Sequence, residues 1–248
     1  MISLVIYPKF LQVGENTFPV RCEVSRGRSS TVKILNGEVV IRLSRYAGEF
    51  QQAKIIEKFL TWAGKRLAKF KPSGFILPDY KDGGKVFTHN KVYDIVVKIT
   101  DRKNNTARLK EGVIEIFLGR VFAEKLSEKG RGVVVKKLAE DVILKDQTSY
   151  LNEVVDELNQ MHFQEKVNLC RFKKTRSRFG SMSRKRNMNI SFRLLFAPRD
   201  VFRYVCVHEL SHLKEFNHSK RFWAVVAGAM PEYKDAEKWL RHNGFMLG

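Results

Sequence analysis

The sequence predicts an α+β protein with a β-rich N-terminal part and a C-terminal part organised around one apolar helix. Three observations predict this class. Apolar and polar residues alternate as in strands through much of the N-terminal half, helical periodicity follows it, and the pattern H-E-x-x-H lies in an apolar helical segment near the C-terminus. The 248 residues suffice for one large domain or two smaller ones. We expect parts at residues 1–130 and 131–248, with Gly130–Gly132 as the hinge.

Residues 1–130 are expected to form mainly antiparallel β-structure with one helix. Asn36-Gly37 is a strong hairpin signal between two of the strands. A helix is expected over Gln51–Phe70, where apolar residues recur on one face. His89 is isolated in this part and is expected at the surface. The expected strands are Val20–Val24, Thr31–Leu35, Val39–Leu43, Val92–Lys98, Ala107–Lys110 and Val113–Leu118.

Residues 131–248 are expected to combine helices with a small sheet. Strand patterning between Val167 and Phe192 is interrupted at Gly180-Ser181. Pro198 suits the first turn of the motif helix, and Ser219 suits the N-cap of the helix that follows. The expected helices are Val133–Leu144, Ser149–His162, Val201–Leu213, Lys220–Ala229 and Glu232–His242.

Two histidines and a glutamate in the helix expected at Val201–Leu213 form a pattern that metal-dependent hydrolases use. Residues four apart share a helix face, so His208 and His212 can bind the same ion. Glu209 is rotated away from that ion but can reach a water molecule bound to it. Zinc lowers the pKa of such a water to roughly 7, and a neighbouring carboxylate can accept its proton. We therefore expect a Zn2+ site with Glu209 as the general base.

The sequence offers more than one candidate for the third metal ligand. His218 follows the motif helix in a short turn between two expected helix caps, and we expect it to complete the site. Glu215 lies one helical turn beyond the second histidine and is an alternative ligand. Glu232 and Glu237 in the last helix are further alternatives, since catalytic zinc sites also use two histidines and one carboxylate.

The segment from His208 to Trp223 reads H-E-L-x-H-L-x-x-x-x-H-S-x-x-F-W, and Ser177–Ser181 reads S-R-F-G-S. These segments resemble the YgjP-like metallopeptidase family, which is related to the SprT-type zinc proteases. The resemblance extends over about Phe172–Asn243, with a weaker match near the first hairpin. It implies a zincin-like fold, a zinc cofactor and activity on peptides. The resemblance also implies a second possible activity, the hydrolysis of nucleoside triphosphates.

Three positions depart from the family pattern. Phe179, Met182 and Ser191 stand where the family has tryptophan, cysteine and asparagine. None of the three is an expected metal ligand. The departures therefore concern substrate recognition and leave the metal site as expected.

A formal charge of +20 is the other main feature of the chain. No acidic residue occurs between Glu165 and Asp200, and the basic stretch there leads directly into the motif helix. We expect it to attract phosphate-bearing partners, either nucleotides or non-specifically bound nucleic acid; an incidental basic surface is the alternative. The expected phosphate contacts are Lys173, Lys174, Arg184, Lys185 and Arg186, and the expected substrate contacts are Arg176 and Arg178.

Affinity for DNA is expected to fall steeply with salt if this stretch binds phosphates. Each neutralised phosphate should contribute about 0.7 to 0.9 to the slope of log affinity against log salt. Replacing Lys173, Lys174, Arg184 and Arg186 by serine should flatten that slope without loss of zinc. Fluorescence anisotropy at several salt concentrations measures it, and an unchanged slope would make the charge incidental.

Three function classes agree with these features. A zinc metallopeptidase agrees with both the motif and the resemblance. A nucleoside triphosphate pyrophosphatase or phosphohydrolase with the same metal site is the first alternative. A nucleic-acid-binding protein with a vestigial metal site is the second, and the intact Glu209 argues against it.

The rest of the sequence favours a cytoplasmic protein without membrane contact. The N-terminus lacks the basic start of a signal peptide. No apolar run approaches the ~18 residues that a membrane helix needs. The three cysteines have neither a disulfide-framework spacing nor a zinc spacing.

Overall fold

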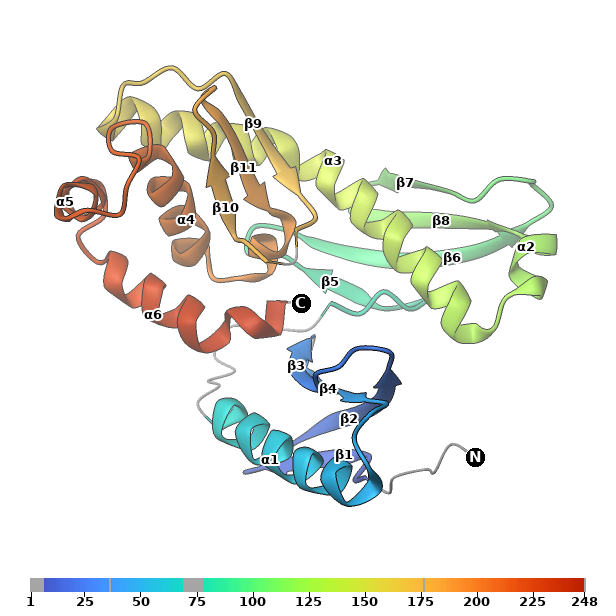
Figure 1. Ribbon diagram of the computed structural model, residues 1–248. Coiled ribbons are helices and arrows are strands. Elements are labelled where there is room, and N and C mark those ends of the chain that lie inside the picture. Colours follow the sequence, from blue (N-terminus) through green and yellow to red (C-terminus); the bar gives the residue numbers. More distant parts are fainter. Residues whose placement is uncertain (1–6, 36, 69–77, 176, 248) are drawn as a thin grey trace. The chain divides into compact units, whose positions relative to one another are not determined.

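The computed structural model describes residues 7–35, 37–68, 78–175 and 177–247, and the chain forms two compact units. Unit 1 comprises residues 1–73 and 238–248, and unit 2 comprises residues 74–237. Both units mix strands and helices (Figure 1), as expected of an α+β protein. The functional division at residue 130 stays a prediction.

Unit 1 is a four-stranded sheet with a helix packed against it. The strand order is β1-β2-β4-β3, in which β2 and β4 run parallel and the outer pairs antiparallel. The N-terminal part was expected to be mainly antiparallel, and only its central pair of strands departs from that expectation. Helix α1 buries Ile56, Ala63 and Leu67. The elements are β1 Phe10–Val13, β2 Asn16–Ser25, β3 Thr31–Leu35, β4 Glu38–Ser44, α1 Glu49–Leu67 and the short η2 Gly244–Leu247.

The first sheet of unit 2 repeats this topology strand for strand. Its order is β5-β6-β8-β7, again with a parallel central pair and antiparallel outer pairs. The β7–β8 hairpin turns over Glu111 and Gly112, whose positive φ angles of 51° and 83° suit a tight hairpin turn. The strands are β5 Lys85–Phe87, β6 Val92–Thr100, β7 Thr106–Lys110 and β8 Val113–Gly119.

A single long helix follows this sheet, where two helices and a hinge were expected. After α2 (Arg120–Lys125), helix α3 runs unbroken over 35 residues, Glu128–His162. Ser127 caps it by accepting a hydrogen bond from the backbone N–H of Gly130, so the expected hinge lies in its first turn. The buried face of α3 includes the fully buried Gln147, whose side-chain amide donates a hydrogen bond to the Tyr93 hydroxyl. This polar residue interrupts the apolar pattern without interrupting the helix.

His89 is half-buried between elements of unit 2, so its expected surface position is wrong. Its Nε2 lies 3.1 Å from the hydroxyl of Tyr150 on α3, and its ring centroid lies 4.8 Å from that of Phe202. Burial lowers the pKa of His89 from 6.5 to about 4, and the nearby charge of Arg199 also lowers it, while backbone carbonyls oppose the shift. His89 is therefore neutral in the folded protein at neutral pH.

Acid is expected to destabilise the protein through His89. Because the unfolded state has the higher pKa, it binds the proton first, and the free energy of unfolding falls as pH drops from 6.5 towards 4. At 1.36 kcal/mol per pKa unit, the loss reaches about 3 kcal/mol, and His89 contributes no pH dependence above about pH 7. Urea unfolding of wild type and His89→Gln at several pH values measures it. The variant should lose less stability on acidification, and equal losses would contradict the assignment.

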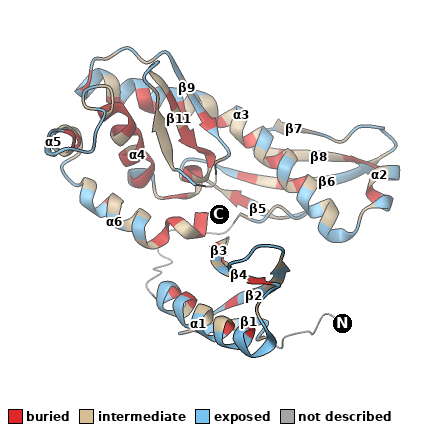
Figure 2. Ribbon diagram, in the orientation of Figure 1, coloured by how far each residue is buried: buried red, intermediate tan, exposed pale blue. Residues whose placement is uncertain are grey.

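The second sheet of unit 2 carries the motif helix. Its order is β10-β11-β9, with β11 parallel to β9 and antiparallel to β10. Helix α4 packs against β10, β11, α3 and α5 (Figure 1) and is buried along most of its length (Figure 2). The elements are β9 Leu169–Lys173, β10 Gly180–Met182, β11 Asn187–Ser191, η1 Phe192–Phe196, α4 Arg199–Ser211 and α5 Lys220–Ala229. Helix α6, Tyr233–Asn243, begins in unit 2 and ends in unit 1.

None of the helices in the described residues has the length and apolar character needed to cross a membrane.

Candidate metal centre

Helix α4 presents two histidines and Glu209 at its C-terminal end. It starts after Pro198, whose fixed φ suits a helix start, and ends at Ser211, with His212 as the C-cap. Neighbouring elements pack on it from several sides, so the residues at its end have a fixed position. The buried apolar residues of α4 are Val201, Phe202, Tyr204, Val205, Cys206, Val207 and Leu210.

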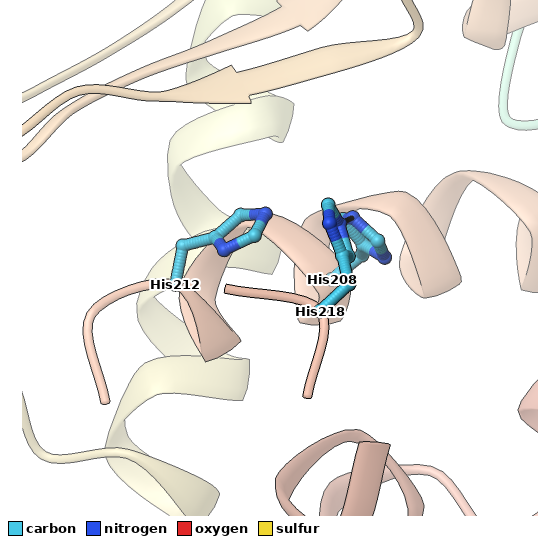
Figure 3. A group of neighbouring side chains, drawn as sticks. All are labelled: His208, His212 and His218. Atoms are coloured by element: carbon cyan, nitrogen blue, oxygen red, sulfur yellow. Dashed lines mark hydrogen bonds between the residues drawn. The ribbon is translucent and has the colours of Figure 1, made fainter. Parts of the chain in front are cut away.

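His208, His212 and His218 form one cluster (Figure 3). The first two extend from the end of α4, and His218 extends from the segment that leads into α5. One ring nitrogen of each lies within 4.8 Å of the other two, and the Nε2 atoms of His208 and His218 are 3.0 Å apart. Among the described residues, no other three histidine, cysteine or acidic side chains gather in this way.

The donor set fits zinc. Tetrahedral zinc binds imidazole nitrogens at about 2.0–2.1 Å, which places the nitrogens roughly 3.3 Å apart, near the spacing of His208 and His218. Metal binding needs neutral imidazoles. Burial lowers the pKa of His208 to about 4, and burial also lowers the pKa of His212. Both rings are therefore neutral at neutral pH, and three nitrogens leave a fourth coordination position open.

Two contacts hold the imidazoles in place. The Nδ1 atom of His212 lies 3.2 Å from the backbone oxygen of Glu215. A bond there places the proton on Nδ1 and leaves Nε2 for a metal. The buried Phe222 ring lies close to all three rings, with centroid distances of 4.9, 4.6 and 4.7 Å to His208, His212 and His218. Phe222 belongs to the H-S-x-x-F-W part of the sequence motif, but the motif alone does not predict this contact.

Ser219 fixes the segment that carries His218. Its hydroxyl oxygen accepts a hydrogen bond from the backbone N–H of Phe222, 3.3 Å away, at the start of α5. This confirms the expected N-cap. His218 is therefore attached to a capped helix start, although its own side chain is exposed.

Glu209 points from α4 towards strand β10 and is only 5% exposed. Burial raises the pKa of Glu209 to about 7, while a hydrogen bond from the backbone N–H of Met182 and the charge of Arg178 oppose that shift. A carboxylate with a pKa near the working pH is suited to accept a proton and to return it. The contacts with Gly180 and Met182 were not foreseen. The strand pattern was expected to be interrupted at Gly180-Ser181, where the structure instead has strand β10.

The structure does not bring the alternative acidic ligands into the cluster. Glu215 contributes its backbone oxygen to His212, and neither Glu232 nor Glu237 belongs to the group of candidate ligands. Arg178 is exposed just before β10, within range of the Glu209 charge. Arg176, the other expected substrate contact, lies outside the described residues.

The five cations expected to contact phosphate differ in their surroundings. The Nζ atom of Lys174 lies 2.8 Å from Oδ1 of Asp141 and 3.1 Å from Oε2 of Glu140. The Nη1 atom of Arg186 lies 2.9 Å from Oε2 of Glu165. Pairing with acids reduces what these two can offer to a phosphate. The exposed and unpaired members among the described residues are Lys173, Arg184 and Lys185. Phosphate or nucleic-acid binding stays a prediction.

Comparisons with known proteins found one similar solved structure and one matching family. A crystal structure of the metallopeptidase zymogen of Methanocaldococcus jannaschii jannalysin is similar over 37% of this chain and 93% of that chain, with 19% identity and a TM-score of 0.33. No curated protein matches the sequence. The family described as "YgjP-like, metallopeptidase domain" matches residues 28–243. This match covers well over half of the chain, which therefore belongs to the YgjP-like metallopeptidase family.

Proposed function

We propose that the protein is a zinc-dependent metallopeptidase with a zincin-like arrangement, in which His208, His212 and His218 hold the ion. One observation carries the proposal: three imidazoles converge at the end of α4, and the buried Glu209 directly follows one of them, His208. Structural zinc sites use four protein ligands, whereas three ligands leave room for a reacting water. Membership of a metallopeptidase family supports peptides as substrates.

The residues divide the work of hydrolysis. A zinc ion in this site would polarise the substrate carbonyl and lower the pKa of a water molecule. Glu209 accepts the proton of the attacking water and then returns it to the leaving amine. Its hydrogen bond from Met182 orients the carboxylate for both transfers. Arg178, exposed beside β10, would bind an oxyanion or a substrate carboxylate.

Hydrolysis of nucleoside triphosphates would use the same metal and the same base. Peptides are favoured for two reasons. The family is a metallopeptidase family, and two of the five cations expected to hold phosphate are paired with acidic side chains.

Parallel assays of the zinc-loaded protein test this choice. One set contains a mixed peptide library and the other contains nucleoside triphosphates, with chelator-treated protein as the control in each. Mass spectrometry should detect new peptide termini in the zinc-loaded sample and no release of phosphate or pyrophosphate. Nucleotide hydrolysis without peptide cleavage would contradict the proposal.

A further inference from the structure

Strand β10 passes Glu209 at a point where there is no room for a side chain. A methyl group on Gly180 would lie 2.7 Å from Cγ and 2.8 Å from Cδ of Glu209, and it would also overlap Oε1. These separations are well inside van der Waals contact. Two residues further along β10, the backbone N–H of Met182 donates a hydrogen bond to Glu209.

We infer that Gly180 is a positioning residue for Glu209. Its missing side chain allows β10 to close on the glutamate, and the N–H of Met182 then fixes the direction of the carboxylate. The inference rests on the function proposed above, because it concerns the orientation of the proposed base.

Packing prevents both elements from moving apart to accept a methyl group. On one side, Gly180 is paired in the sheet with the fully buried Ile190. The backbone N–H of Ser191 also donates a hydrogen bond to the backbone oxygen of Phe179, 2.7 Å away. On the other side, Cys206 and Leu210 of α4 are fully buried. Close-packed interiors resist such shifts, so the glutamate side chain has to move instead.

The contact with Cγ determines how Glu209 would move. The position of Cγ depends on χ1 alone, so rotating the carboxylate end cannot relieve the overlap. Glu209 would have to adopt another χ1 rotamer, which takes the carboxylate away from the Met182 N–H. The backbone of Gly180 adds no strain of its own, because its φ is not positive and suits alanine equally well.

A double-mutant cycle on the metal-free protein tests the contact without using activity. Gly180→Ala is expected to raise the unfolding equilibrium constant at least about fivefold, within the usual range for overpacking. In a Glu209→Ala background the same change should have little effect, because the overlapping atoms are gone. If Gly180→Ala alone fails to fold, the double variant should recover folding. An equal effect in both backgrounds, or no recovery, would overturn the inference.

Kinetics of the zinc-loaded protein test the positioning role. Gly180→Ala should lower kcat at least about tenfold, since small misplacements of a reacting group are costly, while KM and zinc content stay unchanged. Gly228→Ala is the matched control, because a methyl group there meets no atom within 4 Å, and it should keep full activity.

The two proposals fail in different ways. Full kcat in Gly180→Ala, together with an inactive Glu209→Gln, would overturn the positioning role and leave the proposed function standing. An active Glu209→Gln would overturn the proposed function and the positioning role with it. The double-mutant cycle on the metal-free protein would still test the contact between Gly180 and Glu209 in that case.

Discussion

Replacing Glu209 by glutamine is expected to lower kcat/KM at least about 100-fold, the usual scale for loss of a general base. Glutamine has nearly the same shape, and its amide oxygen can still accept the hydrogen bond from Met182. It cannot take a proton from water at neutral pH. The fold and the three histidines should be unaffected, so metal analysis should still find zinc in the variant.

Steady-state assays on a peptide substrate measure this effect. Glu232→Gln is a suitable control, because it removes one carboxylate near the C-terminus that is not part of the cluster, and it should keep wild-type rates. If Glu209→Gln retained more than about a tenth of the wild-type kcat/KM, Glu209 would not be the base.

His218→Ala is expected to weaken zinc binding by well over 100-fold. Changes to residues that only support the ligands already cost 10- to 100-fold, so loss of a ligand should cost more. His218 is the member of the cluster that lies beyond α4 and its C-cap, and the sequence alone left glutamates as alternatives to it. Competition with a chromophoric chelator measures the affinity. His242→Ala, which removes a histidine of α6, should bind zinc like wild type. Full zinc retention by His218→Ala would move the third ligand to an acidic residue.

Local features of this chain were predictable because their signals lie within a few residues. Periodicity and capping residues predict the strands of the β3–β4 and β7–β8 hairpins. They also predict the helix that presents His208 and His212 and the N-cap at Ser219. Spacing alone also indicated that His218 could reach the other two histidines. The geometry of the cluster agrees with that reasoning.

Features that depend on partners far apart in sequence were missed. Alternation shows which face of a strand is buried but not which strand lies beside it, so the parallel pairs β2–β4 and β6–β8 were not foreseen. The buried Gln147 made α3 look like two helices, because its partner Tyr93 lies in a distant strand. The approach of Gly180 to Glu209 likewise joins two segments that periodicity treats separately.

We propose that one zinc ion per chain makes this protein a peptidase. The most direct test is to add zinc in steps to the metal-free protein while following cleavage of a quenched fluorescent peptide library. We expect the cleavage rate to rise in proportion to added zinc and to reach a plateau at one equivalent per chain. No cleavage at one equivalent, or a rate that does not depend on zinc, would contradict it.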